Sequence, residues 1–218
     1  TGGNHWKSPG NNDALVPRLT GDANWRKPLS WNRKAEAAQR RQRVFCGSMM
    51  DWCDKNAPEG ARDRLFALIR ETPWLDWQLL TKRASLIERC LPADWGDGYE
   101  NVWLGVTVED IEHGFSRVKH LSRIPAKVRF LSMEPLLEQL TGLEYLGAMS
   151  EIDWGIVGGE SGPGYREMQN DWADHAMRVL EHWDVPRWFK QWGGNKNDKG
   201  GDIIYGRQIK QWPYGHEQ

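Results

Sequence analysis

The chain has 218 residues, with 29 basic and 30 acidic side chains and a formal charge of −1. This length suits one α/β domain or two small ones, and the near balance of charge excludes a grossly basic nucleic-acid coat and a highly acidic disordered chain. No apolar run approaches the roughly 20 residues that span a bilayer, and the first residues do not resemble a signal peptide. No membrane partner is therefore expected.

Residues 1–42 are polar and rich in Gly, Asn, Pro and Arg. They are predicted to be irregular, with one short helix near residues 31–39. From residue 43 the pattern changes, because short apolar, β-branched or aromatic runs recur at spacings that leave room for a helix between them. These runs cover residues 44–46, 77–80, 102–106, 128–131, 154–157 and 187–189.

The intervening segments carry helical periodicity. Ile111, Phe115, Val118 and Leu121 form one apolar stripe, and a second stripe runs from Trp172 to Trp183. Strands that alternate with helices indicate a parallel sheet. The sequence therefore predicts an α/β domain over residues 43–218, folded as a partial (β/α) barrel of about six parallel strands. A doubly wound sheet is the alternative.

Polar side chains follow each predicted strand, where parallel α/β folds place their chemistry. Because parallel strands point their carboxyl ends in the same direction, we expect these residues to line one mouth. The acids are Asp51, Glu109, Glu134 and Glu160, the bases are Lys82, Arg83 and Lys190, and the hydroxyl residues are Thr107, Ser132 and Ser161.

The segment from Gly158 to Gly164 contains four glycines in seven residues and is the most specific of these strand ends. Glycines let a backbone approach a ligand closely and present its N–H groups. Glu160 in its middle would repel a phosphate, so the segment suits an amine, a ribose hydroxyl or a cation. It matches neither the dinucleotide fingerprint nor the Walker pattern.

The chain has three cysteines, Cys46, Cys53 and Cys90, and no C-x-x-C pair. This odd, widely spaced set indicates three free thiols in a reducing cytoplasm, without a disulfide and without a complete metal site. The 14 tryptophans are unusual for this length. Most fall in predicted strands or helices and are expected to pack, whereas Trp52, Trp192 and Trp212 are predicted to lie in a cleft or on the surface.

The order of the strand-end motifs resembles the phage Gp-thirty-seven/Gp-sixty-eight family, an uncharacterised group related to radical-SAM enzymes. The resemblance runs from about Trp25 to Gly193. The motifs that carry it are VFCGSMMD at 44–51, LLTKR at 79–83, NVWLGVTVE at 101–109, VRFLSMEPLL at 128–137, DWGIVGGESGPG at 153–164 and FKQWG at 189–193.

This resemblance implies a radical-SAM-like partial barrel that uses S-adenosylmethionine and a [4Fe–4S] cluster held by a three-cysteine segment. The chain departs from that pattern, because no such segment precedes Trp25. Either the cluster-binding segment lies upstream of Thr1, which is the favoured expectation, or this homologue has lost it, and no metal ligand is predicted in this chain.

The function expected from the resemblance is that of a phage or prophage enzyme that modifies a nucleic acid or nucleotide in the cytoplasm of the bacterial host. Glu134 and Glu160 are the candidate catalytic residues. The candidate cofactor-binding residues are Thr107, Ser132, Gly158, Gly159, Glu160 and Ser161, and the candidate substrate- or anion-binding residues are Asp51, Lys82, Arg83, Glu109 and Lys190.

Two alternatives remain open at the level of sequence. One is a non-catalytic module that binds nucleic acid or a partner protein. The other is a barrel glycoside hydrolase in which Glu134 and Glu160 form an acid/base pair and tryptophan rings stack on sugar.

Overall fold

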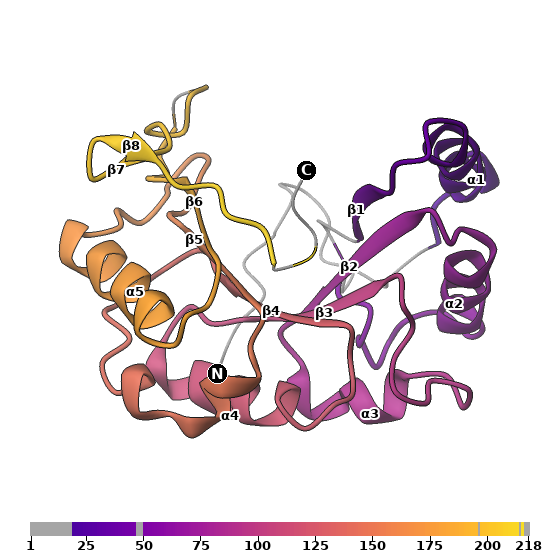
Figure 1. Cartoon of the computed structure of the whole chain (residues 1–218), viewed down its shortest axis with the longest axis horizontal. Helices are drawn as coiled ribbons and strands as arrows, with labels where there is room; N and C mark the ends of the chain where they lie inside the picture. Colours follow the sequence, from indigo (N-terminus) through magenta and orange to yellow (C-terminus); the bar gives the residue numbers. More distant parts are fainter. Residues whose placement is uncertain (1–18, 47–49, 196, 214, 216–218) are drawn as a thin grey trace, which may run out of the picture.

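The computed structural model describes residues 19–46, 50–195, 197–213 and 215. Six parallel strands form one sheet in the order of the sequence, and the sheet curls into a half barrel (Figure 1). The strands are β1 (Gln42–Cys46), β2 (Leu75–Thr81), β3 (Val102–Thr107), β4 (Val128–Met133), β5 (Trp154–Gly158) and β6 (Arg187–Gln191). The predicted partial barrel of six parallel strands is confirmed.

The helices lie on the convex side of this sheet (Figure 1). They are α1 (Asp22–Ala37), α2 (Ala61–Glu71), α3 (Ile87–Cys90), α4 (Ile111–Leu121) and α5 (Asn170–His182), with short 3-10 helices η1 (Ala84–Leu86), η2 (Leu143–Tyr145) and η3 (Gly147–Glu151). A doubly wound sheet would reverse its strand order and place helices on both faces. The sequential order and the one-sided helices exclude that alternative.

Alternating side chains divide the strands between two cores. The larger core lies between the sheet and the helices and contains Leu79, Leu104 and Leu131, which are fully buried. Gly155 lets α5 approach the sheet, because a Cβ at this position would lie 2.4 Å from the Leu180 side chain. The helix-facing side of the sheet is thus completely apolar at its centre, as expected for buried parallel strands.

The concave face carries a smaller cluster made of Trp103, Val128, Phe130 and Trp154. These residues come from the first half of each strand, so the cluster fills the N-terminal end of the half barrel. At Gly105 a Cβ would lie 2.3 Å from the Phe130 ring, so the glycine makes room for this ring. The carboxyl end of the concave face remains lined by smaller and more polar side chains.

The C-terminal segment closes the N-terminal end of the concave face. After the hairpin of β7 (Ile203–Ile204) and β8 (Arg207–Gln208), the chain runs antiparallel to β6, with Phe189 donating its N–H to the carbonyl of Ile209 at 2.9 Å. Trp212 then stacks on Trp154, with ring centroids 5.1 Å apart. The Arg43 guanidinium of β1 lies 3.6 Å from the Trp212 ring centroid, so this ring bridges the two edges of the sheet.

Two expectations about packing are corrected. Residues 22–37 form a full helix rather than irregular chain with a short helix near 31–39, and α1 belongs to the barrel because its Ala35 is fully buried in the main core. Trp52 is 2% exposed and packs edge-on against Phe66, with centroids 6.0 Å apart, so it lines no cleft.

The remaining two cleft candidates also pack within the protein. Trp192 contacts the Phe189 ring at 4.9 Å between centroids and donates its indole N–H to the carbonyl of Ile203 at 2.8 Å. Trp212 belongs to the tryptophan cluster described above. Within the described residues no helix combines the length and apolarity needed to cross a membrane.

Candidate functional site

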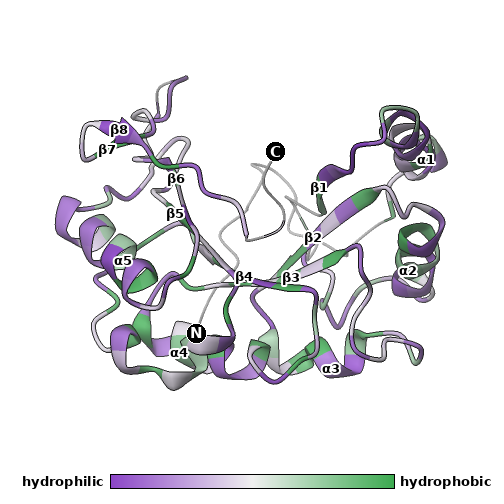
Figure 2. Cartoon of the chain, in the orientation of Figure 1, coloured by the Kyte–Doolittle hydropathy of each residue, from purple (hydrophilic) through white to green (hydrophobic). Residues whose placement is uncertain are grey.

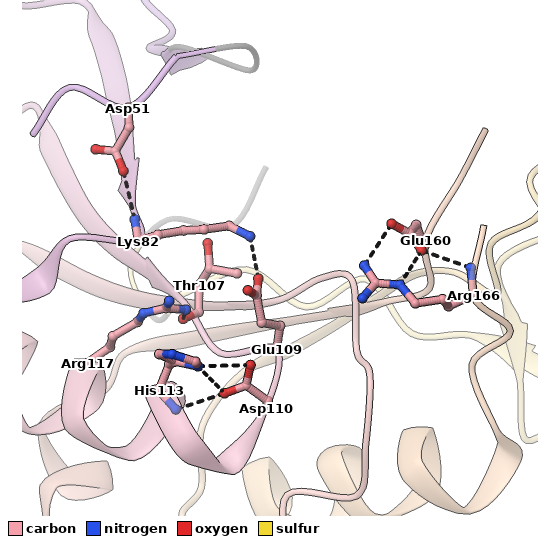
Figure 3. A network of polar contacts seen from close by, with 9 residues as sticks. All are labelled: Asp51, Lys82, Thr107, Glu109, Asp110, His113, Arg117, Glu160 and Arg166. Carbon is pink, nitrogen blue, oxygen red and sulfur yellow. Dashed lines mark hydrogen bonds and ion pairs between the residues drawn. The ribbon is translucent and has the colours of Figure 1, made fainter. Parts of the chain in front are cut away.

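The polar residues predicted from the strand ends gather at the carboxyl end of the half barrel (Figure 3). The Lys82 charge is close enough to Glu160 to help lower the pKa of that carboxyl. The Glu109 charge is likewise close enough to Arg166 to help raise the pKa of its guanidinium. Glu134 lies beside Gly158, since a Cβ on that glycine would be 3.5 Å from the Glu134 carboxyl carbon. Strands β2 to β6 therefore deliver their polar ends to one mouth, as predicted.

Asp51 organises the first part of this rim. Its carboxylate accepts hydrogen bonds from the Thr81 hydroxyl at 2.6 Å and from the Lys82 backbone N–H at 3.1 Å. The Arg83 guanidinium pairs with both Asp51 at 2.9 Å and Asp54 at 3.0 Å. Asp51 thus fixes the end of β2, and Arg83 is neutralised by two carboxylates, one of which, Asp54, the sequence analysis did not identify.

The second part of the rim joins β2 to β3. The Lys82 ammonium pairs with the Glu109 carboxylate across the mouth (Figure 3). Asp110 caps α4 by accepting the backbone N–H of His113 at 2.8 Å, which is the standard role of an acid at a helix N-cap. Arg117 donates to the Thr107 carbonyl at 3.0 Å and holds the end of β3 from the helix side.

The third part of the rim joins β4 to β6. Lys190 pairs with Glu134 at 2.8 Å, and the Gln191 amide reaches both the other Glu134 oxygen at 3.3 Å and the Gly159 carbonyl at 3.1 Å. Glu134 is therefore held by two groups of the neighbouring strand. Its geometry is that of a fixed acceptor at the edge of the mouth.

Glu160 is clamped by Arg166, a residue that the sequence analysis missed. The guanidinium donates to both carboxylate oxygens at 2.8 and 2.9 Å, and the Arg166 backbone N–H donates at 2.8 Å (Figure 3). These bonds hold the pKa of Glu160 below its usual range. Such a bidentate pair is the strong form of carboxylate recognition.

The rim is accordingly a ring of ion pairs in which four bases nearly balance five acids. Each of the three predicted anion-binding cations, Lys82, Arg83 and Lys190, already bonds a carboxylate. An incoming phosphate would have to displace that partner. The mouth is polar but nearly neutral, and its charge pattern favours a ligand that carries both signs or none.

The glycine-rich segment packs against the chain itself. Gly159 donates its N–H to the Gln191 carbonyl at 3.0 Å, Gly194 donates to the Glu160 carbonyl at 2.8 Å, and Ser161 forms a parallel bridge with Gly194. A Cβ at Gly159 would lie 1.9 Å from the Trp192 carbonyl oxygen. Close contact between two backbones therefore explains why position 159 requires glycine.

Below the rim, three buried polar side chains face the concave side of the sheet. They are Gln78, Thr107 and Ser132, which are 7%, 3% and 5% exposed. Thr107 and Ser132 are register partners on β3 and β4, and Gln78 shares its face with Trp103 on the neighbouring strand. None of the three side chains hydrogen-bonds to another described residue, and their polar atoms keep some access to solvent, since they are not among the fully enclosed unpaired atoms of the described residues.

Apolar side chains flank these polar groups. Ile156 is the register partner of Ser132 on β5, and Leu80 lies one step above Gln78 on the same face of β2. Both side chains are only partly buried. The arrangement of apolar walls and a few convergent hydrogen-bonding groups is typical of small-molecule sites.

The described residues do not fit an iron–sulfur cluster. They contain no group of three His, Cys, Asp or Glu side chains that could hold a metal ion. Cys46 and Cys53 are free thiols whose pKa is raised by burial, in the case of Cys46 to about 12. The prediction of three free cysteines is confirmed.

Together, the fold and the site define a parallel half-barrel protein with a nearly neutral polar mouth, beside which polar and partly buried apolar side chains share the concave face of the sheet. The chain belongs to the family described as protein of unknown function (DUF5131), whose sequence profile matches residues 6–213. No curated protein and no solved structure matches the chain significantly.

Proposed function

We propose that this chain is the ligand-binding half barrel of a radical-SAM-like protein of phage or prophage origin, that its concave face binds S-adenosylmethionine, and that it modifies a nucleic acid or nucleotide. The observation that carries the proposal is the set of buried polar side chains on the concave face. Thr107 and Ser132 have hydroxyl groups without a partner among the described residues. A bound nucleoside would satisfy them.

The residues present suit S-adenosylmethionine in its several parts. Thr107, Ser132 and Gln78 offer hydrogen bonds to ribose hydroxyls and base edges, and Leu80 and Ile156 offer apolar contact to the adenine. The ligand's own ammonium and carboxylate match a rim that presents paired charges of both signs. When bound, this group supplies a sulfonium carbon activated for transfer.

The proposal assigns no iron–sulfur chemistry to the described residues, because their cysteines do not fit a cluster. The role of this chain is to bind and orient the nucleoside. Glu134 and Lys190 are positioned to hold the amino-acid end, since both lie at the rim beside Gly158.

The geometry disfavours the glycoside hydrolase alternative. A general acid needs a raised pKa, whereas the Arg166 pair lowers the pKa of Glu160. Glu134 is likewise engaged by Lys190 and Gln191. The tryptophans predicted to lie in a cleft, Trp52, Trp192 and Trp212, pack in or against the two cores instead.

Calorimetric titration of the protein with S-adenosylmethionine tests the proposal. We expect saturable binding at one site, and Thr107→Val or Ser132→Ala should each weaken it about three- to tenfold, the value of one hydrogen bond of roughly 0.5–1.5 kcal/mol. Ser116→Ala, on the exposed side of α4, is the matched control and should bind like the wild type. Absence of binding, or equal affinity in all four proteins, would refute the assignment. Binding without any modification of nucleic acid would favour the non-catalytic module.

A further inference from the structure

Positive charge is concentrated in one stretch of this nearly neutral chain. Between residues 22 and 43 the cations are Arg26, Lys27, Arg33, Lys34, Arg40, Arg41 and Arg43, and the acids are Asp22 and Glu36 alone. Most of this stretch is α1 and the connection from α1 to β1. Figure 2 shows this connection as strongly hydrophilic where the chain enters β1. The four cations of α1 lie outside the mouth, on the convex side of the half barrel, whereas Arg43 reaches the concave face and contacts Trp212.

The cations of α1 share one face of the helix. At about 100° per residue, Arg26, Lys27, Arg33 and Lys34 fall within an arc of roughly 120°, and Trp31 lies about 40° beyond one edge of it. The opposite side packs into the protein, because Pro28, Asn32 and Ala35 are buried. Asp22 and Glu36 fall outside the arc. The cation arc of α1 is thus flanked by the Trp31 ring on one side and by the exposed Asp22 on the other, and the exposed Glu36 lies further round the helix.

These cations form no close ion pair within the described part of the chain, although Arg26 is near enough to Asp22 to help lower the pKa of that carboxyl. Arg26, Lys27, Arg33 and Lys34 make no salt bridge there, whereas nearby Arg41 pairs with Asp76 at 2.7 Å. Asp22, the first residue of the helix, forms an ion pair with Arg64 of α2 at 2.7 Å. The basic face therefore keeps its charge available for an external anion, in contrast to the neutralised rim of the mouth.

Trp31 adds a second kind of contact to this face. Its side chain is 39% exposed, whereas Trp25 on the flank of the same helix packs against the core with Arg64 over its ring at 4.5 Å. An exposed indole among cations is the combination that binds single-stranded nucleic acid, since cations hold phosphates and the ring stacks on a base.

We infer that the exposed face of α1 (Arg26, Lys27, Trp31, Arg33 and Lys34) is a binding surface for single-stranded nucleic acid. The face spans nine residues, about 12 Å from Arg26 to Lys34, which matches roughly three to four nucleotides of a stacked strand. An anionic membrane is the weaker partner, because the side of α1 opposite its cations is packed on the sheet and cannot enter lipid. This inference goes beyond the proposed function, since it concerns a surface separate from the mouth.

Fluorescence anisotropy with labelled oligothymidylate tests the inference on the full chain at several NaCl concentrations. The triple variant Lys27→Gln, Arg33→Gln, Lys34→Gln should bind at least tenfold more weakly at low salt. The slope of log Kd against log salt concentration should fall by about 2, because each of the three lost phosphate contacts contributes roughly 0.7 to it. Trp31→Ala should weaken single-strand binding about tenfold and leave duplex binding nearly unchanged.

A charge-matched control separates this surface from net charge. Arg89→Gln, Lys119→Gln, Arg123→Gln removes three exposed cations from other faces and should leave affinity unchanged. Equal losses in both triple variants would overturn the inference, as would wild-type binding to phosphatidylserine vesicles but not to the oligonucleotide. Adenosylmethionine titration of the α1 triple variant should match the wild type, so failure here is distinguishable from failure at the mouth.

Discussion

Gly159→Ala is predicted to disrupt the junction between the strand ends of β5 and β6. The added methyl would lie 1.9 Å from the Trp192 carbonyl oxygen and 2.6 Å from the Trp192 carbonyl carbon. Both contacts are to backbone, so no side-chain rotation can relieve them. The two connecting segments must separate by more than 1 Å to reach ordinary van der Waals distance.

The cost can be worked out from the bonds at this junction. Overpacking typically destabilises by about 1–3 kcal/mol, and the hydrogen bonds Gly159 N–H to Gln191 and Gly194 N–H to Glu160 contribute roughly 1 kcal/mol each. We expect a loss of about 3 kcal/mol, or a fall in Tm of roughly 6–12 °C for a chain of this size.

Thermal and urea unfolding followed by circular dichroism measure this effect. Gly147→Ala is the matched control, because a Cβ at Gly147 meets nothing within 4 Å and the same methyl should cost little. A Gly159→Ala protein with the wild-type Tm would show that position 159 tolerates a side chain. The glycine would then be better explained by contact with a ligand than by packing of the chain on itself.

Three further outcomes follow from the structure. Trp212→Ala should lower the free energy of unfolding by about 2–3 kcal/mol, because the ring stacks in the aromatic cluster that closes the N-terminal end of the half barrel; an unchanged urea midpoint would show that the C-terminal segment does not close it. Glu160→Gln should cost about 1 kcal/mol or less at neutral pH, since the pair is partly exposed. Because the pKa of Glu160 is lower in the folded protein than in the unfolded chain, ionised Glu160 stabilises the fold above the ordinary glutamate pKa, and this stabilisation is lost as the pH falls. The Tm difference between variant and wild type should therefore vanish in acid. A difference that persists there would contradict the assignment. Ellman's reagent should react slowly with Cys46 and Cys53, because burial raises the pKa of both thiols. The count in denaturant should be three with or without reductant, and a lower count without reductant would reveal a disulfide.

Spacing of the strand motifs was sufficient to predict the fold from residue 43 onward. A run of five or six β-branched and aromatic residues followed by a helical stripe has few folding solutions other than a βα unit. Because parallel strands end on the same side, the gathering of Lys82, Glu109, Glu134 and Glu160 at one mouth also followed from the sequence. The exact strand ends needed only small adjustment.

The partners of these groups could not be predicted in the same way. Arg166 lies in an irregular loop after Glu160, and no periodicity marks its guanidinium as the ligand of that carboxylate. Trp212 meets Trp154 across 58 positions of sequence, a contact that depends on the path of the C-terminal segment. Long-range contacts of loops and termini carry no local signal.

Helix α1 was missed for a different reason. Its buried face is made of Pro28, Asn32 and Ala35, with partly buried Trp25 and Leu29 beside them, so the apolar stripe is weak. The regular spacing of these residues at three and four positions was the signal that could have identified it. The same weak stripe hid the basic face on the other side of the helix.

Photoaffinity labelling with 8-azido-S-adenosylmethionine tests the central claim, that the concave face of the half barrel is the ligand site. The account predicts that label appears on peptides containing β3, β4 or β5 and is suppressed by excess unlabelled S-adenosylmethionine. Thr107→Val should reduce the labelled fraction in parallel with its affinity. Label that is confined to α1 or to the β7–β8 hairpin, or that resists competition, would contradict the claim.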